Sequence, residues 1–550
     1  MLWPWRRRPE ISEKKIVAVM AAVLMVLVFL PTLAAVLLAR ARGLAWSGRT
    51  IFSPDDLTVY LSYLSQAKNG ARLFISNFSA ERSSPFLNLL WLAVGLLGRF
   101  LHLAPLAAYQ LARLLLIPVF AFTVHWATKY FLPTRRERLL ATALMLFASG
   151  WGVYFVPFLP AQLQASGFLA APVDLWVAEA LGFSSAFYSP HFLASWTLII
   201  VSLVLLFRAF TEDRLRLAAW AGLAALVLFN FHPYHAPTLY AVGAAACLAE
   251  LARGRKAWRQ LLALGVFVAV SAPSVIYEWW LMQPARNGAV LAAGNICLTP
   301  PLIYILLGFG ALLPLAVAGF FLQRRRSRAE NQGGEHLAFL VAWAVIELLI
   351  IYAPLAFNRR LLQGWEFPLA VLSATALAAG LDRFDRRSDW RWLRQPALGA
   401  LLFVVVLAPT SLNTVIRDVV LTARNQPPYY FYSSDQVAAF AWMRVHLHYQ
   451  DVVLATYMSG NDLGGWANVS VFEGQWTQTV DVVNKNRAAE HFFSAAATDA
   501  WRQDLLADSG VDYVYWGPAE KNLGADLRGR PYLQAVYTAG DITVFRVTNK

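Results

Sequence analysis

Long uncharged apolar runs alternate with short charged loops over the first three quarters of the chain. The first run, Ile16 to Ala39, holds 24 residues without a charge. About 20 apolar residues in a helix cross a bilayer, whereas a signal peptide has an apolar core of roughly 7–15 residues. This run therefore predicts a retained first membrane span. Ten further segments bring the predicted number of spans to about eleven: residues 105–131, 139–159, 191–207, 217–231, 236–251, 260–281, 300–322, 337–357, 365–381 and 396–416.

One more apolar segment, residues 86–103, has only 13 uncharged residues before Arg99. It is short for a span and predicts an interfacial or re-entrant helix. If it does not cross, 25 Lys and Arg residues gather on one side of the membrane; if it does, 20 of them move to the other side. The positive-inside rule favours the first arrangement, with a cytoplasmic N-terminus. The basic loops are the N-terminus and residues 129–138, 208–216, 253–259, 324–328 and 383–394.

Composition supports a membrane protein. The 550 residues are 58% hydrophobic and 15% charged, with a mean hydropathy of +0.48. The net charge of +14 falls in the predicted cytoplasmic loops, so it indicates contact with membrane lipids and no nucleic acid. Only Cys247 and Cys297 are present, which argues against a disulfide framework or a thiolate zinc site.

Residues 425–550 follow a different pattern, in which short apolar strands alternate with helical stretches. We therefore expect a polytopic α-helical membrane protein with a C-terminal extracytoplasmic α/β domain. The predicted membrane domain covers residues 1–420, with a first outer loop at 40–104, and the soluble domain covers 421–550. The protein is expected in the plasma or inner membrane.

The first outer loop contains the stretch "FSPDDLTVYLSYL", with Asp55 and Asp56 side by side. A purely structural explanation exists: Ser53 suits a helix N-cap, Pro54 suits the first helical position, and both carboxylates favour the positive end of the helix dipole. The helix that follows is amphipathic and is expected to lie on the membrane. One carboxylate suffices for a cap, however, and two adjacent ones repel each other near lipid, so a functional interpretation stays open.

Other polar residues cluster on the same predicted side. An outer-loop carboxylate can act as a general base, and arginines bind phosphate through a planar fork of donors. A water–lipid boundary with both kinds of group suits chemistry on a lipid-linked phosphate. The candidates are Asp174, Glu179, His191, His232, His235, Arg359 and Arg360.

Two of these interpretations have structural alternatives. His232 and His235 form an H-x-x-H pattern, but Pro233 argues against a helical metal-binding pair, and turn-capping or hydrogen-bonding roles are the alternative. Arg113 lies in the middle of a predicted span. It is expected either to reach the headgroup of a lipid carrier or to pair with a buried acid, such as Glu347, or a carbonyl.

A first span, a long outer loop opened by an acidic pair and tyrosine ("DDLTVYLSYL"), and a second outer loop with another acid resemble the GT-C superfamily of integral-membrane glycosyltransferases. The resemblance implies an inverting enzyme of the cell envelope that takes sugar from a polyprenyl-phosphate carrier at the extracytoplasmic face. It implies that Asp55 or Asp56 activates the acceptor hydroxyl. Asp174, or with less support Glu179, is the second acid, and Arg359 and Arg360, with Arg113, bind the carrier phosphate.

Several points stay open at this level. No WWD-type triplet is present, so the acceptor is a saccharide, a lipid or a protein, and a requirement for Mg²⁺ or Mn²⁺ is undecided. A transporter or flippase for a lipid-linked saccharide is an alternative that should place charges along span interiors in paired halves. A non-catalytic scaffold that binds a surface partner is another, and it would leave Asp55 and Asp56 as helix caps only.

Overall fold

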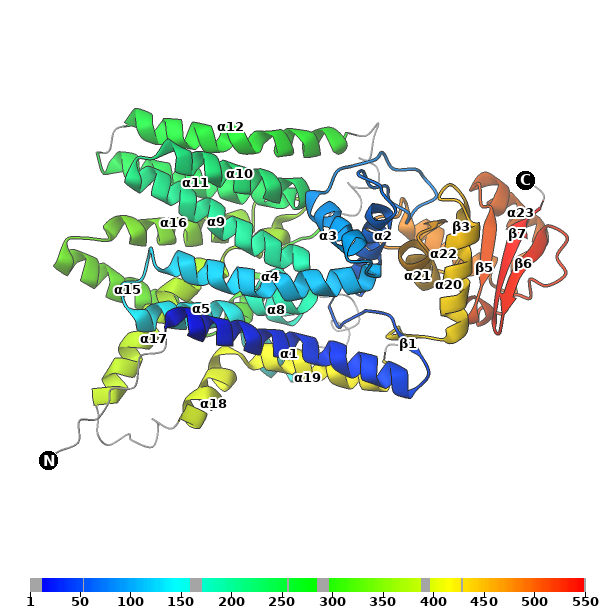
Figure 1. Cartoon of the computed structure of the whole chain (residues 1–550), viewed down its shortest axis with the longest axis horizontal. Coiled ribbons are helices and arrows are strands. Elements are labelled where there is room, and N and C mark those ends of the chain that lie inside the picture. Colours follow the sequence, from blue (N-terminus) through cyan, green and yellow to red (C-terminus); the bar gives the residue numbers. More distant parts are fainter. Residues whose placement is uncertain are drawn as a thin grey trace. The chain divides into compact units, whose positions relative to one another are not determined.

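The computed structural model describes residues 12–52, 54–158, 171–254, 257–283, 296–386, 396–426 and 429–548. The chain divides into two compact units, whose elements are labelled in Figure 1. Unit 1 comprises Met1–Phe29, Arg113–Pro273 and Leu298–Val415; unit 2 comprises Leu30–Ala112, Ser274–Cys297 and Ile416–Lys550. The predicted domains 1–420 and 421–550 stay a prediction, because compactness and membrane insertion are different criteria.

Unit 1 is a bundle of apolar helices. Among its packed pairs are α9 with α10, α15 with α17, and α11 with α16. Its helices and 3-10 turns are α5 (Arg135–Phe147), α6 (Gly152–Phe155), η1 (Val156–Phe158), η2 (Val173–Leu175), α8 (Gly182–Tyr188), α9 (Pro190–Glu212), α10 (Leu215–Phe231), η3 (Pro233–His235), α11 (Ala236–Ala252), α14 (Leu302–Phe309), α15 (Leu312–Glu330), α16 (Gly334–Ile350), η5 (Asn358–Leu362), α17 (Glu366–Arg386) and α18 (Pro396–Leu407), with parts of α1 (Glu13–Ala41), α4 (Pro105–Thr128), α12 (Ala257–Leu281) and α19 (Pro409–Arg424).

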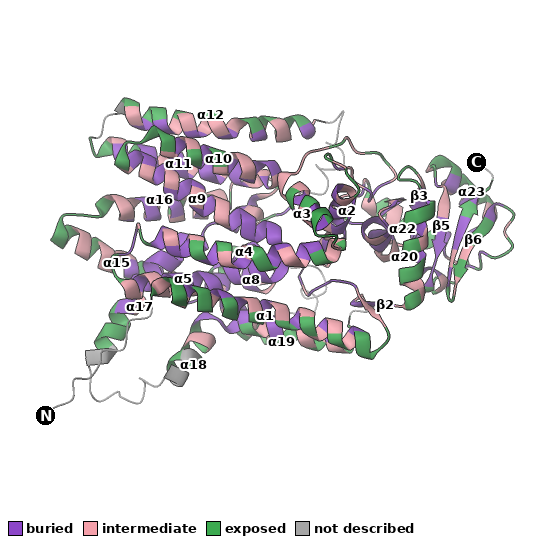
Figure 2. Ribbon diagram, viewed as in Figure 1, coloured by how far each residue is buried: buried purple, intermediate pink, exposed green. Residues whose placement is uncertain are grey.

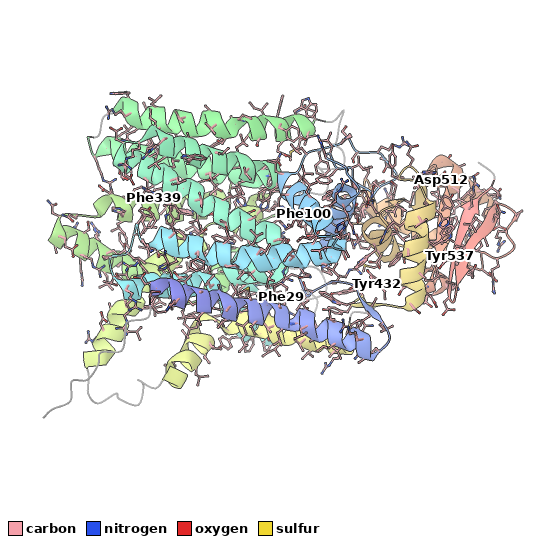
Figure 3. The ribbon with its side chains drawn as sticks, viewed as in Figure 1. Phe29, Phe100, Phe339, Tyr432, Asp512 and Tyr537 are labelled. Carbon is pink, nitrogen blue, oxygen red and sulfur yellow. The ribbon has the colours of Figure 1, made fainter. Side chains whose placement is uncertain are left out.

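Aromatic rings fill part of this core. The rings of Phe207 and Phe339 stack with centroids 4.6 Å apart, and those of Trp343 and Phe367 with centroids 5.1 Å apart; Phe339 is marked in Figure 3. Burial differs between helices: α8 and much of α9 are buried, whereas α12 has intermediate and exposed residues along its length (Figure 2). Exposed apolar side chains are what a membrane-facing helix surface requires, since lipid replaces water there.

Membrane-capable helices are present, but several predicted spans are broken. Among the described residues, five helices are long and apolar enough to cross a membrane, or up to eight if each bent pair counts as one span. The bent pairs are Arg135–Phe147 with Gly152–Phe158 (45°), Leu302–Phe309 with Leu312–Glu330 (75°), and Leu401–Leu407 with Pro409–Arg424 (90°). The prediction of about eleven spans therefore stays a prediction, and three of the predicted spans fall on these bent pairs.

The three breaks meet one another within unit 1. The backbone N–H of Trp151 donates to the carbonyl of Leu307 at 2.8 Å, and that of Ser149 donates to Leu407 at 2.7 Å. A Cβ atom added to Gly150 would lie 2.3 Å from the backbone of Gly308. Glycine is therefore required at this crossing, where two chain segments approach backbone to backbone.

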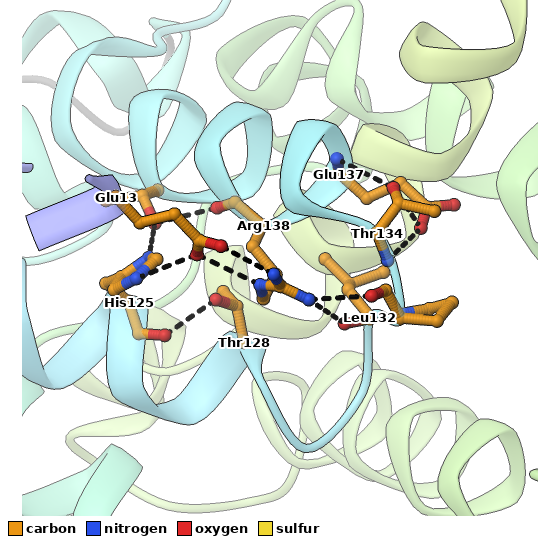
Figure 4. A network of polar contacts seen from close by, with 9 residues as sticks. Glu13, His125, Thr128, Leu132, Thr134, Glu137 and Arg138 are labelled. Carbon is orange, nitrogen blue, oxygen red and sulfur yellow. Dashed lines mark hydrogen bonds and ion pairs between the residues drawn. The ribbon is translucent and has the colours of Figure 1, made fainter. Parts of the chain in front are cut away.

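Polar side chains join α1, α4 and α5 in the same unit (Figure 4). Arg138 donates to both carboxylate oxygens of Glu13, from Nε at 3.1 Å and from Nη2 at 2.6 Å. Nε2 of His125 lies 3.2 Å from the same carboxylate. Thr134 and Glu137 form a capping box at the start of α5. Charged groups in an apolar bundle are costly unless paired, so this network fixes the start of α1 against the bundle.

Unit 2 combines the first loop with the tail. β1 pairs antiparallel with β2, and a five-stranded sheet has the order β4-β3-β5-β7-β6, in which β3 runs parallel to β4 and β5. Tyr432 belongs to the buried cluster on one side of this sheet, and the partly buried Tyr537 packs against that cluster (Figure 3). The elements are β1 (Ala45–Trp46), α2 (Asp56–Lys68), α3 (Leu89–Phe100), β2 (Phe431–Tyr432), α20 (Ser434–His446), β3 (Val452–Leu454), α21 (Tyr457–Asp462), η7 (Leu463–Ala467), β4 (Ser470–Val471), α22 (Val482–Phe492), α23 (Asp499–Asp508), β5 (Tyr513–Trp516), α24 (Pro518–Lys521), β6 (Leu533–Ala539) and β7 (Ile542–Val547).

Two sequence expectations for the first loop have clear outcomes. The segment 86–103 forms α3 with 12 residues, which at 1.5 Å per residue is too short to span a bilayer, as predicted. The expected start of α2 at Pro54 is wrong: the helix begins at Asp56, and Asp55 occupies the N-cap without a side-chain capping hydrogen bond. Ser53, the expected cap, lies outside the described residues.

Candidate active site

The acidic pair lies at the start of α2 in unit 2. The hydroxyl of Tyr457 donates to Oδ2 of Asp55 at 2.8 Å. Nε2 of Gln475 donates to Oδ1 of Asp56 at 2.7 Å. Both carboxylates thus bind side chains from the tail, more than 400 positions later in the sequence, instead of capping their own helix.

A buried ion pair supports the backbone just before this pair. Nη2 of Arg49 donates to Oδ1 of Asp462 at 2.5 Å, and the hydroxyl of Tyr432 donates to the same oxygen at 2.7 Å. Nε of Arg49 donates to the carbonyl of Pro54 at 3.2 Å. Burial works to lower the pKa of Arg49, but the charges of Asp462, Tyr432 and Asp55 together raise it above its usual value. The guanidinium therefore keeps its charge and holds the residue that precedes Asp55.

The sequence did not single out Arg49, Asp462, Tyr457 or Gln475. Each is polar and lies in a loop or a short helix, where a polar residue is ordinary. The only sequence signal near them is the polar and glycine-rich composition of "YMSGNDLGG" and "FEGQWTQT".

The predicted arginines form a turn in unit 1. Arg359 and Arg360 lie on η5, and Cζ of Arg359 lies 4.6 Å from the ring centre of Trp176. Nε of Arg359 is 3.9 Å from Oε1 of Glu179, too far for a hydrogen bond, and among the described residues this Nε has no hydrogen-bond partner. Cζ of Arg360 lies 4.6 Å from the ring centre of Tyr234. Nε of Arg359 is thus a buried donor without a hydrogen bond among the described residues.

The predicted histidines are brought together next to this turn. Nε2 of His235 lies 3.1 Å from Nδ1 of His232 and 3.0 Å from Oε1 of Gln363, which follows η5 in sequence. Nδ1 of His232 is also 2.9 Å from the hydroxyl of Ser195, and Nδ1 of His191 is 2.7 Å from that of Ser189. One ring nitrogen of each histidine, Nδ1 of His232 and Nε2 of His235, thus bonds within the cluster, as the hydrogen-bonding alternative expects.

Charge and metal binding can be judged for the same histidines. Burial lowers the pKa of His235, in the turn between α10 and α11, to about 3, so this ring is neutral at physiological pH. Among the described residues, no group of three or more His, Cys, Asp or Glu side chains could hold a metal ion. A role for Mg²⁺ or Mn²⁺ stays undecided.

Arg113 is buried in α4. Its Nη2 donates to the carbonyls of Ala186 and Phe187 at 3.3 and 2.5 Å, and its Cζ lies 4.8 Å from the ring centre of Phe29. Glu347 instead accepts a hydrogen bond from Nε1 of Trp343 at 2.6 Å. These contacts match the expected pairing of Arg113 with a carbonyl, and phosphate binding by this residue stays a prediction.

Asp174 lies beside the crossing of the three broken helices. Its Oδ2 accepts a hydrogen bond from the backbone N–H of Gly152, the first residue of α6, at 3.0 Å. The carboxyl group is buried, with 3% of the residue exposed. Burial raises its pKa to about 7, although hydrogen bonds from Thr410 and Gly152 oppose the shift. Asp174 therefore changes its protonation close to neutral pH.

Asp174→Asn is expected to remove a pH dependence of stability. Because the pKa in the folded protein lies above the ordinary 3.8, the folded state binds the proton more tightly than the unfolded state. The stability from the protonated form is complete below about pH 4 and is lost as the pH rises to about 7, at no more than about 1.4 kcal/mol per pH unit. Thermal unfolding of the detergent-solubilised protein at pH 5 and 8 measures this loss. An equal loss in the variant would contradict the assignment to Asp174.

Comparison with solved structures identifies the fold. The oligosaccharyltransferase of Archaeoglobus fulgidus in complex with Zn and sulfate is 15% identical, with a TM-score of 0.51 over 92% of this chain and 67% of that chain. The arabinofuranosyltransferase AftD from Mycobacteria is 14% identical, with a TM-score of 0.51 over 98% of this chain and 40% of that chain. ArnT from Cupriavidus metallidurans bound to undecaprenyl phosphate is 12% identical, with a TM-score of 0.49 over 97% and 98%.

These similarities concern fold, because the sequences have diverged far. No family model matches the sequence, and no curated protein matches it significantly. The predicted resemblance to the GT-C glycosyltransferases is confirmed at the level of the fold.

Proposed function

We propose that the protein is a membrane glycosyltransferase that moves a sugar from a polyprenyl-phosphate-linked donor to an acceptor at the extracytoplasmic face. One observation carries the proposal: in a chain with the GT-C fold, the Asp55 side chain makes no capping hydrogen bond, and both carboxylates at the start of α2 accept hydrogen bonds from side chains of the tail. A scaffold would leave these acids as caps only.

The chemistry divides between two groups of residues. Asp55 or Asp56 takes the proton from an acceptor hydroxyl, whose oxygen then attacks the anomeric carbon of the donor. The bond from that carbon to the carrier phosphate breaks with inversion, and the carrier phosphate leaves. Arg359 and Arg360 compensate its charge, for which a guanidinium is suited because its N–H donors form a planar fork that matches phosphate oxygens. Asp174 is the proposed second acid, with Glu179 next to Arg359 in second rank.

The predicted topology indicates on which side of the membrane the reaction takes place. The basic loops support a cytoplasmic N-terminus, and with it a first loop and a tail on the outer side of the membrane. The acceptor, whether saccharide, lipid or protein, is therefore expected outside the plasma or inner membrane.

The full-length protein in liposomes tests this function. The probe is an undecaprenyl phosphate with a radiolabelled sugar, supplied with a cell-envelope extract as the source of acceptor. Release of undecaprenyl phosphate, together with label in a product other than the donor, is the expected result. Movement of intact donor across the membrane without release would instead establish the flippase alternative. If neither release nor movement of the donor is observed, the proposed enzyme function is overturned.

Arg359→Gln and Arg360→Gln are expected to raise KM for the lipid-linked donor or to lower kcat, by roughly tenfold or more each, because a charge-assisted hydrogen bond to phosphate contributes about 1.5–3 kcal/mol. Initial rates at several donor concentrations measure the effect. Arg325→Gln, in an exposed position of α15, is the matched control and should behave as wild type. Wild-type kinetics in both turn variants would remove the phosphate-binding role.

A further inference from the structure

The carboxyl edge of the tail's parallel strands meets the acidic pair. β3 and β4 are adjacent and parallel, so the chain leaves both at the same edge of the sheet. Tyr457 lies three residues after the end of β3, and Gln475 lies four residues after the end of β4. Ligands and functional groups of parallel sheets gather at this edge, because the loops there all point the same way.

Each donor serves a different carboxylate. The Tyr457 hydroxyl contacts Asp55 at 2.8 Å, and the Gln475 amide contacts Asp56 at 2.7 Å. Adjacent carboxylates repel each other, and a hydrogen bond to the ionised form offsets this repulsion. Two separate donors therefore hold the two carboxylates in one fixed arrangement.

The tyrosine donor is held by its own loop. The neighbouring Thr456 donates to Oε1 of the buried Glu520 from its backbone N–H at 3.0 Å and from its hydroxyl at 2.6 Å. The other oxygen of Glu520 accepts the backbone N–H of Gly517 at 3.0 Å. Glu520 thus joins the loop after β3 to the loop after β5. Burial and the charge of Asp55 raise the pKa of Tyr457, so its phenol keeps the proton that it donates.

The glutamine donor is oriented by a second contact. Oε1 of Gln475 accepts hydrogen bonds from the backbone N–H of Thr477 at 2.8 Å and from the Thr477 hydroxyl at 2.7 Å. With its oxygen bound to two donors, the amide must turn its NH₂ group toward Asp56. On the other side, the carbonyl of Asp55 accepts the hydroxyl of Thr58 at 2.7 Å and the amide of Asn461 at 3.3 Å.

We propose that Tyr457 and Gln475 are positioning residues of the active site, Tyr457 acting through Asp55 and Gln475 through Asp56. The tail is then part of the catalytic machinery and not an appended binding domain. This inference rests on the proposed glycosyl transfer, and it adds a pairing rule: the donor that holds the more important acid is the more important donor.

Tyr457→Phe and Gln475→Met are the primary variants, since each removes a donor and keeps most of the side-chain volume. The variant that removes the hydrogen bond to the general base should lower kcat roughly tenfold. KM for the lipid-linked donor should stay within twofold of wild type. Loss of a donor to a carboxylate favours its protonated form, so the acid limb of the pH–rate profile should move to higher pH. These variants leave unchanged other groups that interact electrostatically with Asp55, namely Arg49, Asp462 and Tyr429.

The pairing rule makes the test specific. If Asp55→Asn is more damaging than Asp56→Asn, Tyr457→Phe should be more damaging than Gln475→Met, and the reverse order should hold if Asp56 is the base. Gln475→Glu sets a third carboxylate against Asp56 and should lower activity more than Gln475→Met. Opposite rank orders, or wild-type kcat and pH profiles in both donor variants, would overturn the proposal.

Matched controls separate positioning from folding. Tyr449→Phe removes a hydroxyl from an exposed tyrosine in the tail, and Gln503→Met removes an exposed amide on α23; both should behave as wild type. Unfolding temperatures measured for all variants identify any that fold poorly, and the pH profile reports only on folded enzyme. If the wild type itself releases no carrier phosphate, the proposed function fails; if it does and the donor variants match it, only the positioning role fails.

Discussion

Asp55→Asn and Asp56→Asn are expected to differ in effect: the substitution that removes the general base lowers the rate of sugar transfer by roughly 10²–10⁴-fold, and the other lowers it much less. Asparagine cannot take a proton from the acceptor hydroxyl at neutral pH. The remaining rate reflects binding and orientation of the substrates, which do not depend on the base. Single-turnover measurements with radiolabelled donor give the rate of the chemical step directly.

Both substitutions should leave the fold intact, which makes their kinetics interpretable. The side-chain carbonyl of asparagine still accepts the hydrogen bonds that Tyr457 and Gln475 donate. Asp55 makes no side-chain cap on α2 that the change would remove. Asp504→Asn, in an exposed position of α23, is the matched control. Wild-type transfer rates in both Asp55→Asn and Asp56→Asn would exclude the pair as the general base.

The helices of the bundle were predictable because their signal is local. An apolar run long enough for a span reports on burial in lipid or protein wherever the run lies in the chain. The predicted span 217–231 corresponds to α10, which begins at Leu215. The segment around α3 was separated from the spans by its length and by the charges of the loops.

Two of the three helix breaks could not be predicted, because contacts between distant segments accompany them. The third break directly precedes Pro409, which is visible in the sequence. Gly150 and Gly310 each lie inside an apolar run and read as ordinary helix residues. Gly150 is needed because another backbone crosses at its Cα, and Gly310 has a positive φ of 49° at its break. Neither a close backbone contact nor a positive φ can be recognised from the hydropathy pattern.

The acidic pair shows the same limit at the candidate site. Two adjacent carboxylates mark a position in the sequence, but cap and base are equally compatible with that pattern. The partners that decide between these roles are Tyr457 and Gln475, which are remote in sequence and ordinary in type. Such pairings cannot be recognised in a single sequence. In the fold, the residues meet because the tail's partners follow strands at the carboxyl edge of one sheet.

Asp462→Leu is expected to be the most destabilising single change in unit 2, by about 3–5 kcal/mol, because it leaves the charge of Arg49 buried without a partner. Arg49 and Asp462 are 2% and 7% exposed, so water cannot replace the lost carboxylate. Denaturant or thermal unfolding of the purified protein measures the loss. Transfer activity should fall as well, since Arg49 also holds the carbonyl of Pro54, next to Asp55.

Two comparisons isolate the buried charge as the cause of that loss. The double variant Arg49→Met with Asp462→Leu removes both charges and should recover much of the stability that Asp462→Leu loses, because an apolar pair of similar volume avoids the desolvation cost. Asp526→Leu breaks the exposed pair between Asp526 and Arg528 and should leave unfolding unchanged, since water screens an exposed pair. If the double variant were as unstable as Asp462→Leu alone, the loss would come from packing, and Arg49 would not be the group that ties the acidic pair to the tail.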